Sequence, residues 1–318
     1  MDIIQVITKE LNVEKWQVEA AVKLIDEGCT IPFISRYRKE ATGSLNDEQL
    51  RTLHERLTYL RNLEEKKNQV LGSIEEQGKL TAELKKQILD AQTLVVVEDL
   101  YRPFRPKRRT RAIIAKEKGL EPLANIIMLQ MTDKPIEEEA QDFVSEDKGV
   151  ESVADAINGA KDIIAEHISD EADYRIYLRK LTMDRGSVAS TAKKPEESSV
   201  YEMYYEFEEP IKKLAGHRVL ALNRGEKEKI LTVKVNAPEE EAMGWLQKQV
   251  ITKENPITKP ILREVVEDSY KRLIAPAIER EIRNELTEKA EDGAITVFGK
   301  NLEQLLMQPP IAGRVVLG

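Results

Sequence analysis

Residues 46–77 read NDEQLRTLHERLTYLRNLEEKKNQVLGSIEEQ, a long helical pattern that indicates the fold class. Four leucines recur at alternating steps of three and four residues, which places them on one helix face: Leu50, Leu53, Leu57 and Leu60. Asn46 or Ser44 suits the N-cap position, and two acidic residues follow in the first turn, where the helix dipole favours them. Glu64 and Lys67 interrupt the apolar stripe, so the stretch predicts one leg of an antiparallel helical hairpin instead of a coiled coil.

Similar patterns predict further helices along most of the chain. The expected helices cover residues 2–11, 13–27, 81–91, 93–101, 110–119 and 122–129, two within 152–181, one from 238, one over 260–291 interrupted near Pro276, and one over 294–307. Two apolar runs, residues 217–222 and 230–235, flank a glycine-containing turn and predict a β-hairpin. Residues 184–199 lack large apolar side chains and predict an exposed connection. The fold class is therefore mainly α: a multi-helical array with a small β-hairpin.

Composition limits the function classes. The 318 residues are 41% apolar and 33% charged, and their formal net charge is −8. The single cysteine, Cys29, excludes an intrachain disulfide and fits a reducing compartment. The N-terminus lacks the pattern of a signal peptide, and no segment approaches the ~20 apolar residues that a membrane span needs. A cytoplasmic protein without a membrane segment is expected.

One segment departs sharply from this acidic background. Residues 101–111 read YRPFRPKRRTR, with six cations in the last ten residues and no acid: Arg102, Arg105, Lys107, Arg108, Arg109 and Arg111. We call these six residues the basic strip. Such a concentration of charge calls for compensation, either by the phosphates of a nucleic acid or by carboxylates from elsewhere in the fold. The neighbouring Tyr101 and Phe104 can stack on bases or anchor the segment to a core.

A second, smaller group of cations includes Arg36 and Arg38, in a stretch expected to form a loop or broken helix. They join the basic strip as candidate nucleic-acid-binding residues. Trp16 is expected to serve helix packing, and a stacking role is the alternative.

The sequence offers no support for catalysis. The three histidines are far apart, and the chain contains no HExxH, no paired CxxC, no Gly-x-Ser-x-Gly and no glycine-rich phosphate loop. No catalytic residue, metal site or cofactor is predicted, so the chain is expected not to be an enzyme.

Several long segments resemble the Tex family of bacterial transcription accessory proteins. These segments are residues 31–45 (IPFISRYRKEATGSL), 98–111 (EDLYRPFRPKRRTR), 119–124 (GLEPLA), 294–306 (AITVFGKNLEQLL) and 313–318 (GRVVLG). The resemblance spans essentially the whole chain.

The resemblance implies a nucleic-acid-binding protein linked to transcription. It implies an N-terminal helical region over residues 1–195 with a helix-turn-helix-like unit, for which the helices between Asp2 and Gly28 are candidates. Residues 196–312 would form a second helical region with the hairpin, and residues 313–318 the first strand of an RNase H-like domain. In the family, a helix-hairpin-helix module and an RNA-binding OB-fold follow.

Two functional hypotheses follow. In the first, the chain serves transcription through contact with RNA or DNA, and RNA polymerase or other transcription machinery is a further partner. In the second, it is a helical protein-interaction scaffold that binds no nucleic acid itself, and the arginines of the basic strip face internal carboxylates.

Overall fold

The computed structural model describes residues 2–106 and 108–308. The protein is mainly α-helical, as the sequence predicts. Its chain forms two compact units, unit 1 (Met1–Pro106) and unit 2 (Lys107–Gly318). Residue 195 falls inside unit 2, and the strand expected at residues 313–318 lies outside the described residues.

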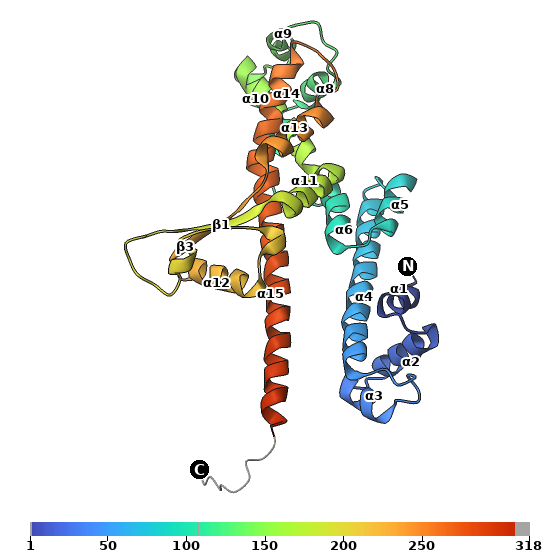
Figure 1. Ribbon diagram of the computed structural model, residues 1–318. Helices are drawn as coiled ribbons and strands as arrows, with labels where there is room; N and C mark the ends of the chain where they lie inside the picture. Colours follow the sequence, from blue (N-terminus) through green and yellow to red (C-terminus); the bar gives the residue numbers. More distant parts are fainter. Residues whose placement is uncertain (1, 107, 309–318) are drawn as a thin grey trace. The chain divides into compact units, whose positions relative to one another are not determined.

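Unit 1 is built around one long helix. Its elements are α1 (Ile3–Leu11), α2 (Lys15–Asp26), α3 (Ile31–Tyr37), α4 (Asp47–Glu76), α5 (Ala82–Asp90), α6 (Leu94–Tyr101) and the 3₁₀ turn η1 (Arg102–Phe104). Helices α1, α2 and α3 lie against the N-terminal half of α4, and α5 and α6 lie against its other end (Figure 1). Asn46 caps α4, and its side chain accepts a hydrogen bond from the Gln49 amide. The helices expected over residues 2–11, 13–27, 46–77, 81–91 and 93–101 are confirmed to within two residues at each end. Helix α3 forms within the stretch that the sequence predicts to be a loop or broken helix.

Lys67 explains why the apolar stripe of α4 is interrupted. Its side chain is only 1% exposed. The Lys67 Nζ donates to the Leu89 carbonyl at 2.8 Å, near the end of α5, and lies 3.2 Å from the Glu64 carboxylate. The charge is therefore satisfied inside the pair of helices, and it fixes α5 on α4.

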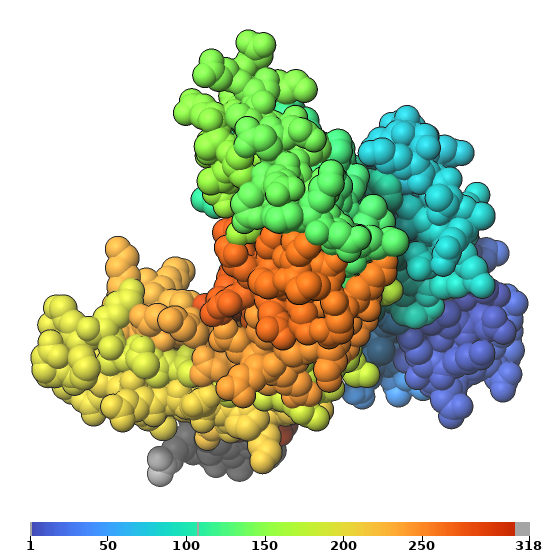
Figure 2. All heavy atoms as spheres, turned by 90° about the horizontal axis from the view of Figure 1, so that it is seen from above, coloured from blue at the N-terminus to red at the C-terminus, as the bar shows by residue number. Residues whose placement is uncertain are grey.

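Unit 2 contains a helical layer and a sheet. Its helices are α7 (Arg111–Glu117), α8 (Glu121–Leu129), α9 (Ile136–Gln141), α10 (Val153–Asp170), α11 (Ala172–Arg185), α12 (Gly216–Lys227), α13 (Glu239–Val250), α14 (Thr258–Asp268) and α15 (Ala275–Leu306). Helices α7, α8, α9 and α14 pack around α10. Figure 2 shows the green α8–α10 region lying directly against the orange α13–α14 region.

The sheet of unit 2 corrects two predictions. It has three antiparallel strands in the order β2-β1-β3: β1 (Ser187–Ala192), β2 (Glu206–Pro210) and β3 (Leu231–Asn236). The central strand β1 lies within residues 184–199, which the sequence predicts to be an exposed connection, so that prediction is wrong for this part. The physical reason is that β1 is made of small residues, and the buried Ser190 satisfies its hydroxyl by donating to the Tyr204 carbonyl at 2.6 Å.

The predicted β-hairpin at residues 217–235 is also wrong. Its second run forms β3, but its first run and turn form helix α12. Val219 and Leu222 are buried at helical spacing, and α12 packs against α15. Gly225 is no turn residue: a Cβ there would lie 2.6 Å from Leu231 Cδ1 and 3.2 Å from Tyr201 Cδ1. Close packing of β3 against α12 therefore accounts for this glycine.

One helical axis runs through unit 2 from Thr258 to Leu306. Between α14 and α15 lies the π-helical turn η5 (Ser269–Ile274), in which the Ala275 amide donates to the Tyr270 carbonyl five residues earlier. Pro276 lacks an N–H and crowds the preceding turn, so the widened turn lets the axis continue past it. The sequence predicts a kink or interruption near Pro276, and the π turn lies there, but the helical axis is not broken. The separate helix expected over residues 294–307 is wrong, because α15 continues from Ala275 to Leu306 and no proline lies between residues 291 and 294 to end it.

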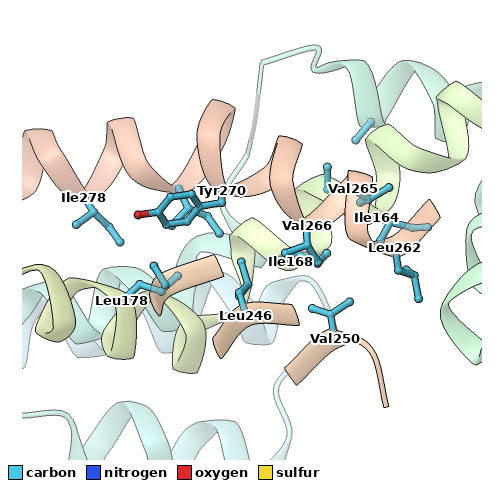
Figure 3. Packing of buried hydrophobic residues seen from close by; sticks show 14 of the residues in the cluster. Ile164, Ile168, Leu178, Leu246, Val250, Leu262, Val265, Val266, Tyr270 and Ile278 are labelled. Atoms are coloured by element: carbon cyan, nitrogen blue, oxygen red, sulfur yellow. The ribbon is translucent and has the colours of Figure 1, made fainter. Parts of the chain in front are cut away.

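The core of unit 2 forms along this axis. Side chains from five helices and η5 point toward one another in Figure 3: Ile164, Ile168, Leu178, Leu246, Val250, Leu262, Val265, Val266, Tyr270 and Ile278. Burial raises the pKa of Tyr270 to about 12, with a smaller contribution from Glu239. Beyond this core, residues 291–308 of the α15 region are exposed, and Figure 1 shows no other described element of unit 2 beside them.

A charged clamp joins α11 to α15. Glu281 accepts hydrogen bonds from the fully buried Arg175 at 2.5 Å and from Arg179 Nε at 2.8 Å. Removing the shared carboxylate would leave two guanidinium groups in a water-poor site without that partner.

We expect Glu281→Ala to lower the free energy of unfolding by about 3 kcal/mol. Removing one partner of a buried ion pair leaves the other charge uncompensated, which costs about this much. Chemical denaturation followed by circular dichroism measures the loss. The control is Glu285→Ala on the same helix, whose partner Lys289 is exposed, with an expected loss of at most ~0.5 kcal/mol. Equal losses in the two variants would show that the clamp contributes no more than a surface pair.

A second ion pair predicts a pH dependence. Arg283 on α15 donates to the Glu226 carboxylate on α12, with one contact at 3.1 Å. This hydrogen bond lowers the pKa of Glu226, and burial only partly opposes it. The pair therefore stabilises the fold fully above the carboxyl's ordinary pKa of about 4.5, and this stabilisation disappears as the pH falls through the lowered value.

Glu226→Gln should therefore be less stable than the wild type at pH 7, and the difference should shrink as the pH is lowered toward 3. Urea denaturation across this range measures it. The exposed Glu288→Gln on α15 is the control, and its difference from the wild type should stay near zero. A Glu226→Gln difference that is constant with pH would contradict the assignment.

Candidate nucleic-acid interface

The basic strip is divided between the two units. Arg102 and Arg105 belong to unit 1, whereas Arg108, Arg109 and Arg111 belong to unit 2. Lys107 lies outside the described residues.

The two aromatic residues of this segment anchor it to unit 1. Tyr101 and Phe104 are partly buried against the core of that unit. The Tyr101 hydroxyl lies 3.0 Å from Ser73 Oγ, and Gln77 Nε2 donates to the Phe104 carbonyl at 3.0 Å. The structure thus favours anchoring over base stacking for this pair.

The cations of the strip in unit 1 have partners of their own. Arg102 is half-buried and already takes part in an interaction. Arg105 is 65% exposed and lies 3.7 Å from Glu98, which also pairs with Lys66 at 2.6 Å. Arg105 is therefore the more distant of two cations at one carboxylate.

The cations in unit 2 differ in their surroundings. Arg108 is exposed and has no ion pair within the part of the chain that the structure describes. Arg109 is 70% exposed and lies 2.9 Å from Glu117. Arg111 begins α7 and lines an open pocket with Asp162. Burial raises the pKa of Asp162, although Arg272 and Arg111 oppose this rise.

The structure therefore does not assign the basic strip wholly to internal carboxylates or wholly to an external phosphate partner. Arg105 and Arg109 meet carboxylates, but at exposed positions, where an ion pair contributes only about 0–1 kcal/mol. A phosphate can replace such a partner at little cost. Binding by the strip stays a prediction.

Arg36 and Arg38 lie at the opposite end of unit 1 from Arg102 and Arg105. Helix α3 packs at the start of α4, whereas Tyr101 and Phe104 attach near its end (Figure 1). Thirty residues of α-helix span about 45 Å. The structure thus separates the candidate residues of unit 1 into two surfaces.

The surface at α3 combines cations with exposed aromatic rings. Phe33 and Tyr37 are one helical turn apart, with ring centroids 5.4 Å from each other, and the Arg38 guanidinium lies 5.4 Å from the Phe33 centroid. We call the following residues the α3 patch: Trp16, Phe33, Arg36, Tyr37, Arg38 and Lys39. Arg36, Arg38 and Lys39 are exposed and form no ion pair among the described residues.

Trp16 of α2 belongs to this patch through the turn that follows α3. Gln17 Nε2 donates to the Thr42 and Gly43 carbonyls at 3.2 and 3.0 Å. Gly43 has a φ of +61°, and a Cβ on it would lie 2.6 Å from Trp16 Cη2. Trp16 itself remains 52% exposed, so the expectation of a packing role accounts for only part of its surface. The signal in the sequence was the glycine, which marks the close approach of the indole.

Other kinds of site find no support in the described residues. No group of three or more His, Cys, Asp or Glu side chains within residues 2–106 and 108–308 is arranged to hold a metal ion. In the same residues, each helix is too short or too polar to cross a bilayer.

The fold and these surfaces define a mainly helical protein of two units, each with exposed cations. Residues 1–75 match the Tex-like protein N-terminal domain, and residues 131–298 match the Tex central region-like family. The chain belongs to the Tex family. In the sequence, the basic strip falls between the two matched regions.

Curated relatives agree with this assignment. The chain is 50% identical over 317 residues to the uncharacterized protein YdcI of Bacillus subtilis, covering 99% of this chain and 44% of that protein. It is 37% identical to the transcriptional accessory protein Tex of Neisseria gonorrhoeae, covering 100% and 42%. It is 33% identical to the human S1 RNA-binding domain-containing protein 1, covering 100% and 33%. The chain thus spans less than half the length of these relatives.

Gly43→Ala should destabilise the turn beneath the α3 patch, because alanine is strained at positive φ and its methyl group meets Trp16 and Gln17. We expect a loss of about 2 kcal/mol or more in the free energy of unfolding, measured by urea denaturation. Gly78→Ala is the matched control: its φ is +66°, but nothing lies within 4 Å of the added Cβ. It should lose only about 1 kcal/mol. If both variants lost the same free energy of unfolding, the contact of Trp16 and Gln17 with the turn would contribute nothing to stability.

Proposed function

We propose that this chain is the nucleic-acid-binding helical part of a transcription accessory factor and has no catalytic role of its own. Membership of the Tex family supports the link to transcription. A cytoplasmic location and contact with RNA polymerase or related machinery belong to the same proposal, as does a helix-turn-helix role for α1 and α2.

The observation that carries the proposal is the display of cations on an acidic chain. The formal net charge is −8, yet Arg36, Arg38 and Arg108 are exposed without an ion pair in the described parts of the chain. Among the described residues, Arg105 and Arg109 pair with carboxylates whose side chains are 39% and 53% exposed. A phosphate backbone is the polyanion that such groups bind, with counterion release as the driving force.

The basic strip is tested by reversing the charge of three of its exposed arginines together, Arg105→Glu, Arg108→Glu and Arg109→Glu. Fluorescence anisotropy is measured with single-stranded and duplex DNA and RNA at a series of salt concentrations. We expect weaker binding at low salt. The slope of log affinity against log salt should fall by about 2 on single strands and about 3 on duplex, since each lost phosphate contact removes about 0.7 or 0.9.

The matched control reverses three exposed lysines of unit 2 that lie outside the strip: Lys212, Lys213 and Lys248. It changes the net charge by the same amount, so a purely global electrostatic effect would weaken binding equally in both variants. Equal weakening, or unchanged affinity of the strip variant, would remove the strip from the binding surface.

A second candidate function is a helical scaffold that binds other proteins and no nucleic acid. The observation that favours it is the exposed apolar face on the second half of α15, which includes Ile295, Phe298, Leu302 and Leu305. Under this alternative the strip variant would lower the melting temperature by removing ion pairs, and the wild type would bind none of the oligonucleotides.

A further inference from the structure

The α3 patch holds most of the exposed aromatic side chains in the described part of the chain. Among the described residues four aromatic side chains are exposed, and three of them belong to the patch: Trp16 at 52%, Phe33 at 38% and Tyr37 at 68%. The remaining one, Phe298, lies on α15. Aromatic residues make up only 5% of the chain, and leaving such rings in water forgoes about 2 kcal/mol of burial each. Their concentration at one place therefore points to a ligand.

The charge of the patch selects the kind of ligand. Residues 31–44 carry three cations and one anion, Glu40, so this segment has a net charge of +2 in a chain of net charge −8. Two acids at the start of α2, close to Trp16 in sequence, have local roles, because Glu14 caps that helix and Glu19 pairs with Lys15. Exposed rings beside cations that form no ion pair among the described residues match a ligand with flat faces and negative charge.

Buried contacts and hydrogen bonds fix the backbone that carries the rings. Ile34, between Phe33 and Tyr37 in sequence, is fully buried in the core of unit 1. The Arg38 carbonyl accepts hydrogen bonds from the Thr42 amide and hydroxyl at 3.2 Å, and Gln17 ties the same turn to α2. A ligand would therefore meet a surface that is largely ordered before binding, which lowers the entropic cost of association.

We propose that the α3 patch is a stacking surface for single-stranded nucleic acid. Bases stack on Tyr37, Phe33 and Trp16, while Arg36, Arg38 and Lys39 contact the phosphates. The bases of a duplex already stack on one another and present no free faces to the rings, so the patch favours single strands. This inference rests on the proposed function and goes beyond it by naming the form of nucleic acid and the residues that distinguish it.

The test compares Tyr37→Ala with Phe298→Ala in the whole chain. Both side chains are 68% exposed, so neither variant removes core packing, and circular dichroism checks that helicity is unchanged. The probes are a labelled 12-nucleotide single strand, as DNA and as RNA, and a hairpin duplex of the same sequence. Anisotropy titrations give the dissociation constants.

Tyr37→Ala should weaken binding to the single strands about tenfold, because one base–aromatic stack contributes 1–3 kcal/mol, and should change duplex binding less than twofold. Tyr37→Phe should retain wild-type affinity, since it keeps the ring. Phe298→Ala should leave both affinities unchanged. Arg36→Glu with Arg38→Glu should weaken single-strand and duplex binding together and reduce the salt slope.

The outcomes separate this inference from the proposed function. If only the arginine variant weakens binding, or if Tyr37→Ala affects duplex and single strand alike, the stacking surface is refuted and the nucleic-acid function stands. If neither variant changes a binding that the wild type shows, the α3 patch is not part of the interface. If the wild type binds no oligonucleotide, both proposals fail and a protein partner for the patch is favoured.

Discussion

Unit 2 depends on a single helical axis that continues through a proline. Pro276 has no amide hydrogen to donate, and its ring crowds the carbonyl one turn earlier, so an ordinary α-helix would bend or end there. The π turn at Ser269–Ile274 absorbs this constraint. It also turns Ser269 inward, where the hydroxyl donates to the Ala165 carbonyl at 2.7 Å and fixes the axis on α10. Because the axis continues, Ile278 and Ile282 extend the core, and Glu281 reaches the two arginines of α11.

Unit 1 uses its long helix differently, as a spacer. The two ends of α4 carry separate functional candidates, the α3 patch at one end and Arg102 and Arg105 at the other. Lys67 lies toward the C-terminal end of α4. Its charge can be buried there because its ammonium group donates to a carbonyl of α5 and pairs with a carboxylate of α4. Cations at the two ends of such a helix cannot contact the same few phosphates. They define two surfaces of unit 1, and each needs its own test.

Local chemistry made most helices predictable. Asp2, Asn46, Thr81, Thr93, Thr110 and Ser152 each accept a hydrogen bond from the first turn of the helix that they precede. Where the local pattern allowed two answers, packing decided. Residues 217–222 are apolar enough for a strand, but Val219 and Leu222 find their partners at helical spacing. The strand β1 has hardly any large apolar residue, and it became a strand because two neighbours pair with it across 14 or more residues of chain.

The amino-acid sequence alone determined the helical class, the ends of the capped helices and the presence of a cationic segment in an acidic chain, because caps, periodicity and charge act over a few neighbouring residues. It also carried the resemblance to the Tex family. Only the tertiary structure decided which strand is central, that Tyr101 and Phe104 anchor the segment, and that Trp16 lies against the turn after α3. These outcomes depend on contacts between residues far apart in the chain, and the free energy of such contacts exists only once the intervening elements have packed.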